Sequence, residues 1–223
     1  MQNSIVENIR SIRATIPTGV ELLCVSKFHP ATDIMQAYQA GERLFGESRV
    51  QELVQKYAQL PHDIQWHFIG HLQTNKIRPI VPFVSLIHGI DSFHLLESID
   101  KEAAKVNRKI RVLIEVHVAQ ETTKFGFSPN ELIHFFATEK WQDLPHIEIC
   151  GLMGMASFTD NSAQIQSEFH QIKTLFDEIR SKYFVSNDNF NILSMGMSDD
   201  YKIAITEGSN LVRIGTNIFG KRN

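Results

Sequence analysis

An apolar run, ELLCVS at residues 21–26, is followed directly by Lys27 and, three residues later, by Pro30. The run is typical of a buried strand, and the lysine marks its end. In a barrel of parallel strands, a polar residue at the end of a strand points into the active surface. An amine that is partly desolvated there has a lowered pKa and can attack an aldehyde to form a Schiff base. The position alone also fits a lysine whose stem is buried and whose charge reaches solvent.

Two turns near the end of the sequence combine a glycine, which lets backbone amides approach a ligand, with a short hydroxyl donor. These residues are Gly196 and Ser198 in LSMGMSDD, and Gly215 and Thr216 in LVRIGT. Ser198 is also expected to cap a helix that begins at Asp199 and so to contribute to an anion pocket. Either turn by itself fits an ordinary tight turn. Because the loops after strands seven and eight of barrels recurrently bind phosphate, the two together predict a phosphate site.

Strand eight adjoins strand one in a closed barrel, which would bring the phosphate site beside Lys27. The two features together predict a small phosphorylated aldehyde as the ligand. Arg213 alternates with Val212 and Ile214, so it points away from the side that these residues bury. It could meet the ligand from inside the barrel, or it could be structural.

The elements that must position these residues alternate between short apolar runs and longer amphipathic patterns. The predicted strands cover residues 21–26, 43–47, 65–70, 84–90, 109–119, 147–153, 191–197 and 210–215. A helical pattern follows each of the first seven strands, and an additional amphipathic helix at 4–16 precedes them all. Parallel neighbours need such crossovers. The pattern predicts the α/β class, a single-domain (β/α)8 TIM barrel over residues 1–223, with a doubly wound open sheet as the alternative.

The composition is that of an ordinary soluble globular protein, with 43% hydrophobic and 21% charged residues. A net charge of -3 argues against nucleic acid as a partner. The N-terminal residues show no secretion signal, and no apolar run approaches the roughly 20 residues that span a bilayer. Cys24 and Cys150 each lie in an apolar run, which favours reduced core residues over a disulfide. We therefore expect a cytoplasmic protein that does not interact with membranes.

Six motifs in matching order, from about residue 20 to residue 221, resemble the pyridoxal phosphate homeostasis proteins, the YggS and PROSC family. They are VSKFHP, FGESRVQE, WHFIGHLQTNK, GLMGM, LSMGMSDD and VRIGTNIFG. This family looks like the barrel half of alanine racemase, fold type III. The resemblance implies pyridoxal 5'-phosphate (PLP) as cofactor, with Lys27 forming the internal aldimine. It also implies that the phosphate is held by Ser198, Gly215 and Thr216.

The resemblance further implies that Arg213 approaches the pyridine nitrogen. Two positions depart from the family pattern. Ser48 follows FGE, where the family often has an asparagine near the ring, and His71 stands where many members have proline. Serine is shorter and has a single donor, so the contact at Ser48 remains open.

Several features favour binding of PLP over catalysis. An arginine is always protonated, so it donates to an unprotonated pyridine nitrogen, which makes the ring a poorer electron sink. Only nine residues follow Ile214, so we expect no second domain to supply the second base of a racemase. The four tyrosines, Tyr38, Tyr57, Tyr183 and Tyr201, all fall in predicted helices. We expect a monomer that buffers or delivers PLP, with apo PLP-dependent enzymes as candidate recipients. The alternative function is a weak amino-acid racemase or a related PLP-dependent enzyme.

Three further patterns in the sequence bear on this interpretation. Lys124, in ETTKFGF, is the chief rival of Lys27 for the Schiff base. His29, His67 and His71 lie near strand ends, but without HxH spacing or a carboxylate cluster we do not expect a metal site. Helical or strand-end spacing predicts that five phenylalanines belong to the core: Phe135, Phe136, Phe158, Phe169 and Phe176.

Overall fold

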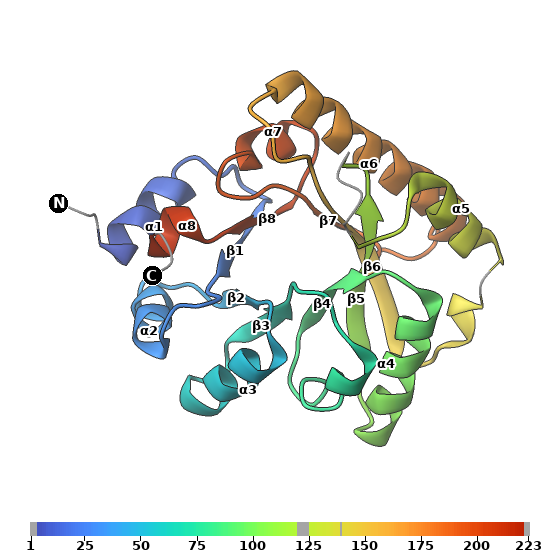
Figure 1. Cartoon of the computed structure of the whole chain (residues 1–223), viewed down its shortest axis with the longest axis horizontal. Coiled ribbons are helices and arrows are strands. Elements are labelled where there is room, and N and C mark those ends of the chain that lie inside the picture. The colour runs from blue at the N-terminus through green and yellow to red at the C-terminus, as the bar shows by residue number, and fades with distance from the viewer. Residues whose placement is uncertain (1–3, 120–124, 139, 221–223) are drawn as a thin grey trace.

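The computed structural model describes residues 4–119, 125–138 and 140–220. Eight parallel strands form a closed barrel in sequence order, and Figure 1 shows them as an inner ring with the helices outside. The strands are β1 Glu21–Val25, β2 Leu44–Glu47, β3 Gln65–Phe68, β4 Leu86–Ile90, β5 Ile110–His117, β6 Ile147–Met155, β7 Ile192–Ser194 and β8 Leu211–Ile214. The barrel closes through four paired positions, from Glu21 beside Leu211 to Cys24 beside Ile214. The predicted TIM barrel is confirmed, and the open sheet is wrong.

The helices lie on the outside of the barrel and connect successive strands. They are α1 Ile5–Arg13, α2 Ala31–Gln39, α3 Val50–Gln59, α4 Phe93–Lys105, α5 Pro129–Thr138, α6 Ser162–Tyr183, α7 Tyr201–Thr206 and α8 Thr216–Phe219, with 3-10 turns η1 Thr74–Lys76 and η2 Trp141–Asp143. The extra N-terminal helix is confirmed, whereas the sequence did not predict α8. None of the helices in the described part of the chain has the length and apolar character needed to cross a membrane.

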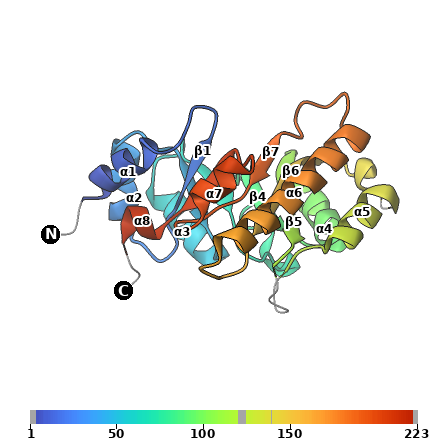
Figure 2. The ribbon, with the colours of Figure 1, turned by 90° about the horizontal axis from the view of Figure 1, so that it is seen from above.

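The two ends of the described chain meet on one side of the barrel. Helix α1 begins at a capping box, in which the Ser4 and Glu7 side chains each accept a hydrogen bond from the other residue's backbone N–H. The side-chain amide of Asn8 then donates to the carbonyl of Ile218 in α8, at 2.9 Å. Figure 2 shows α1, α2 and α8 side by side at this end. Helix α8 is thereby fixed next to the end of β8.

Side-chain alternation along the strands divides the buried residues into an outer core and the barrel interior. On β8, Val212 and Ile214 belong to the large core between sheet and helices. Leu211 belongs instead to a small apolar cluster built from β1, β4, β5, β6 and β8, which only the barrel interior can bring together. Arg213 shares the inward face with Leu211 and is 5% exposed. The prediction that Arg213 points away from the side of its neighbours is confirmed.

Two smaller predictions about apolar residues have different outcomes. Cys24 and Cys150 are both buried and are not joined by a disulfide, as expected. Four of the five phenylalanines are buried, but Phe158 is 95% exposed, so the prediction that it belongs to the core is wrong. Phe158 comes after the end of β6 at Met155 and before α6, and there it lines the mouth of the barrel.

Candidate functional site

A cavity of about 730 Å³ opens at the carboxyl ends of the strands, the end at which barrel enzymes bind their ligands. Its walls come mainly from the segments that follow β1, β6, β7 and β8. Five of the six residues that the sequence nominated line this one cavity: Lys27, Ser198, Arg213, Gly215 and Thr216. An amine, two hydroxyl residues and a guanidinium therefore face the same space.

The sixth nominated residue, Ser48, is the exception. Ser48, directly after β2, is partly buried and is not among the residues that line the cavity. Its carbonyl oxygen would lie 2.3 Å from a Cβ at position 70, so Gly70 is required for β2 and β3 to approach here. The contact predicted for Ser48 stays a prediction. Lys124 lies outside the residues that the structure describes.

His71 takes part in a polar and aromatic contact at the rim. Its Nδ1 lies 3.1 Å from a carboxylate oxygen of Asp91, and its ring stacks on Phe125 with the centroids 3.8 Å apart. These contacts join the segments after β3, β4 and β5. A proline at position 71 could not make the contact with Asp91, because its side chain has no polar atom. His71 therefore organises the rim on the side opposite β1 and β8.

Inside the barrel, Arg213 is held by fixed acceptors. One terminal nitrogen, Nη1, donates to the carbonyl and to the hydroxyl of Ser194, each at 2.8 Å. The other, Nη2, donates to the carbonyl of Gly154 at 3.0 Å. Burial lowers the pKa of Arg213 to about 10, opposed by the carboxylates of Asp200 and Glu115, so the guanidinium is charged at neutral pH. Its Nε–H and one N–H of Nη2 have no acceptor among the described residues and can meet a ligand.

A chain of hydrogen bonds continues from Arg213 across the interior. Ser194 Oγ lies 3.3 Å from His88 Nδ1, and His88 Nε2 lies 3.1 Å from His67 Nδ1. These distances fit a chain in which the Ser194 oxygen accepts from Arg213, the Ser194 hydroxyl donates to His88, and His88 donates to His67. Burial lowers the pKa of His67 to about 3 and that of His88 well below its usual value. Both histidines are therefore neutral, as this arrangement requires.

The turn after β7 differs in one respect from the prediction. Helix α7 begins at Tyr201, with Asp200 before it, and no side chain caps it, so the expectation that Ser198 caps a helix from Asp199 is wrong. The carboxylate of Asp200 instead accepts the N–H of Met197 at 2.6 Å. This contact closes the turn around Ser198 and leaves the Ser198 hydroxyl free of a capping role.

The turns after β7 and β8 are connected to each other. Asn217, in α8, donates from its side-chain amide to the carbonyl of Ser198 at 2.8 Å. A Cβ at Gly215 would lie 3.0 Å from the carbonyl oxygen of Val25, which is tighter than an ordinary contact, so glycine favours this close approach of β8 to β1. Three carboxylates, Asp160, Asp199 and Asp200, also line the cavity and oppose an anion there. The Asp200 carboxylate accepts the backbone N–H of Met197, which leaves Asp160 and Asp199 as the main opposing charges.

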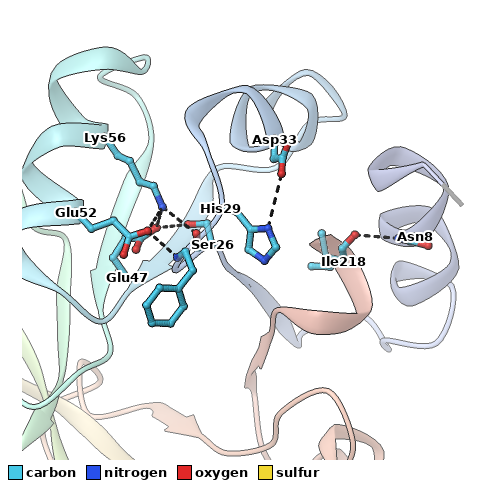
Figure 3. A network of polar contacts seen from close by, with 9 residues as sticks. Asn8, Ser26, His29, Asp33, Glu47, Glu52, Lys56 and Ile218 are labelled. Carbon is cyan, nitrogen blue, oxygen red and sulfur yellow. Dashed lines mark hydrogen bonds and ion pairs between the residues drawn. The ribbon is translucent and has the colours of Figure 1, made fainter. Parts of the chain in front are cut away.

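His29 extends the wall beside Lys27. Its ring stacks on Phe219 of α8 with centroids 5.0 Å apart, and its Nδ1 lies 3.7 Å from Asp33. His29 thus connects the segment after β1 to α8, and Figure 3 shows its contact with Asp33 in α2. Among the residues that the structure describes, no three histidine, cysteine or carboxylate side chains are grouped so as to hold a metal ion.

A buried ionic cluster next to Lys27 was missed from the sequence. It consists of Ser26, Glu47, Glu52 and Lys56, and Figure 3 shows the three charged side chains converging on the end of β1. Two signals were available: a buried strand that ends on a glutamate, and a Glu–Lys pair four residues apart on the helix that follows. The Glu–Lys pair is also typical of a solvated helix surface, so local pattern alone does not reveal that the cluster is buried.

The comparisons with known proteins agree on one family. The family model described as "Alanine racemase, N-terminal domain" matches residues 2–223. The pyridoxal phosphate homeostasis protein of Aquifex aeolicus is 41% identical over 203 residues, which are 91% of this chain and 87% of that protein. The chain belongs to the pyridoxal phosphate homeostasis protein family. The resemblance that the motifs indicated is therefore confirmed.

Solved structures of this family have the same fold. PipY of Synechococcus elongatus, solved without PLP, has a TM-score of 0.90 and 37% identity, covering 97% of this chain and 100% of PipY. PipY with PLP bound gives a TM-score of 0.89 at 36% identity. Alanine racemase of Clostridium difficile has a TM-score of 0.75 at 14% identity, covering 98% of this chain and 56% of the racemase. That last likeness shows a shared fold alone.

The cavity of this family member has the size and the donors that PLP requires. Its volume lies within the roughly 300–1,000 Å³ usual for small-molecule sites. PLP carries an aldehyde, a ring nitrogen and a phosphate. Lys27 could receive the aldehyde, the uncommitted donors of Arg213 could reach the ring nitrogen, and Ser198, Gly215 and Thr216 could donate to the phosphate.

Proposed function

We propose that this chain binds PLP reversibly, holds it as a Schiff base on Lys27, and takes part in PLP homeostasis by buffering or delivering the cofactor. The observation that carries the proposal is that Lys27 lines the same cavity as Ser198, Gly215 and Thr216. The amine condenses with the aldehyde, a C=N bond forms, and water leaves. The names of the family's relatives and the PLP-bound structure of PipY support the same conclusion.

The roles of the other residues follow from their contacts. The hydroxyls of Ser198 and Thr216 and the backbone at Gly215 hold the phosphate, because these groups donate from turns that Asn217 connects. The hydrogen bonds to Ser194 and Gly154 hold the charged guanidinium of Arg213 in place, where it donates to the ring nitrogen. Because arginine can only donate, this contact keeps the ring nitrogen unprotonated. An unprotonated ring withdraws electrons weakly. This arrangement favours storage of the cofactor over carbanion chemistry on it.

Candidate recipients of the cofactor are apo PLP-dependent enzymes, and we infer that the protein acts as a monomer. Delivery is tested by mixing the PLP-loaded protein with an apo-enzyme and measuring that enzyme's activity over time. The proposal predicts transfer to the apo-enzyme, and no turnover when D- or L-alanine is added to the loaded protein alone. Steady interconversion of the alanine enantiomers would contradict the proposal and favour a racemase.

A further inference from the structure

The turn that carries Lys27 has an unfavourable backbone conformation. The N–H of His29 donates to the carbonyl of Ser26 at 3.1 Å, which closes a four-residue turn with Lys27 and Phe28 at its centre. Phe28 has a φ of 69°, in the left-handed region. A type II turn normally has glycine at this position, because a side chain there is strained. Such a conformation persists only where the surrounding structure holds it.

Helix α3 supplies the groups that hold this turn on both sides of Lys27. Lys56 Nζ donates to the carbonyl of Ser26 at 2.8 Å, which fixes the peptide group before Lys27. Glu52 Oε1 accepts the N–H of Phe28 at 2.6 Å, which fixes the peptide group after it. Figure 3 shows Lys56 and Glu52 reaching this segment from the same helix. The backbone on either side of the reactive amine is therefore held by two side chains of opposite charge.

A third contact acts on the Phe28 ring. The guanidinium of Arg49, the residue before α3, lies 4.6 Å from the centre of that ring. Glu52 and Lys56 are four positions apart and share one face of α3, and Arg49 reaches the same turn from the residue before the helix. That face is directed at the turn that contains Lys27.

The cluster is costly to maintain, which argues against a role in stability alone. Lys56 is 6% exposed and Glu47 is fully buried, with 2.7 Å between Lys56 Nζ and Glu47 Oε1. The other Glu47 oxygen, Oε2, has no hydrogen-bond partner among the described residues, and burial raises the pKa of Glu47 to about 7. Well-packed apolar residues are often at least as stabilising as such a buried pair. The pair therefore contributes little net stability, and its contacts with the turn are the feature that distinguishes it.

We propose that Glu52 and Lys56 are positioning residues for Lys27. They hold the 26–29 turn, with Phe28 in its left-handed conformation, so that the amine of Lys27 faces the cavity. Neither side chain lines the cavity, so each acts only through the turn. This inference rests on the proposed function, in which Lys27 receives the aldehyde of PLP.

The test compares Glu52→Ala alone with Glu52→Ala combined with Phe28→Gly. Glu52→Ala removes the acceptor of the Phe28 N–H, and we expect affinity for PLP to fall about tenfold, or about 1.4 kcal/mol. The fraction of PLP that borohydride traps on Lys27 should fall in parallel. Glycine adopts a φ of 69° without strain, so adding Phe28→Gly should restore the affinity to within about threefold of the original. Glu178→Gln, on the exposed face of α6, is the control for losing one negative charge.

Urea unfolding of each variant separates a positional effect from a general loss of stability. Glu52→Gln keeps an oxygen at the same place and should lose only about threefold in affinity, which provides a second variant if Glu52→Ala folds poorly. Equal PLP affinity in the original protein and Glu52→Ala would overturn the positioning role. A weak Glu52→Ala that Phe28→Gly does not restore would overturn it too. An original protein that does not bind PLP would overturn the proposed function itself.

Discussion

Replacing His67 by asparagine tests whether His67, at the far end of the hydrogen-bond chain from Arg213, is neutral in the native protein. An asparagine amide oxygen can take the place of Nδ1 and accept from His88, so the chain keeps its direction. Burial lowers the pKa of His67 to about 3, whereas histidine in an unfolded chain titrates near 6.5. Between these values the unfolded state binds one proton more than the native state does. The original protein must therefore lose stability relative to the variant as the pH falls below about 6.5.

The magnitude follows from the two pKa values. Between pH 7 and pH 5, protonation of the unfolded histidine should cost the original protein about 2 kcal/mol relative to His67→Asn. The comparison must be a difference between two proteins, because Glu47 and Glu115 act in the opposite direction. Burial raises the pKa of each to about 7, so each adds stability as the pH falls from about 7 to 4.5. These contributions are common to both proteins and cancel in the difference.

The assay is urea unfolding of both proteins at pH 7 and pH 5, with the free energy of unfolding extrapolated to water. We expect His67→Asn to gain about 2 kcal/mol on the original protein between the two pH values. A difference that does not depend on pH would mean that His67 can be protonated in the native state. The assignment of donors along Ser194, His88 and His67 would then be refuted.

Two further substitutions test the turns after β7 and β8. Gly196 has a φ of 90°, and a Cβ there would lie 2.6 Å from the Ala204 Cβ and 2.8 Å from the Tyr201 Cα. Gly19 has a similar φ of 91°, but a Cβ there would meet nothing within 4 Å. In urea unfolding, Gly196→Ala should therefore lose clearly more stability than Gly19→Ala. Equal losses would mean that backbone strain alone matters, about 1–2 kcal/mol. Thr216→Val removes one donor and should weaken PLP binding about three- to tenfold without changing affinity for unphosphorylated pyridoxal, as measured by absorbance titration. Equal weakening for both ligands would place Thr216 away from the phosphate.

Much of the barrel could be predicted because its signals are local. The run before Lys27 shows where β1 ends, and alternation on β8 shows that Arg213 faces inward. The short helix α8 was missed because its four residues are too few to show the hydrophobic periodicity of a helix. The cap expected at Ser198 was wrong because Asp200 uses its carboxylate on Met197 instead, a choice that depends on how the turn packs.

The parts of the site that could not be predicted depend on contacts between distant segments. Glu52 and Lys56 fit a solvated helix pair as well as a buried one, until β1 is placed against α3. The positive φ of Phe28 has no sequence signal, since phenylalanine rarely adopts it. The links from Arg213 through Ser194 to His88 join three strands, and only the closed barrel brings them together.

The most direct test of the account is borohydride reduction of the PLP-loaded protein, followed by digestion and mass spectrometry of the modified peptide. The account predicts that the cofactor is fixed on Lys27 and that Lys27→Ala abolishes the visible absorbance of the bound cofactor. Modification of another lysine such as Lys124, with the absorbance of Lys27→Ala unchanged, would contradict it.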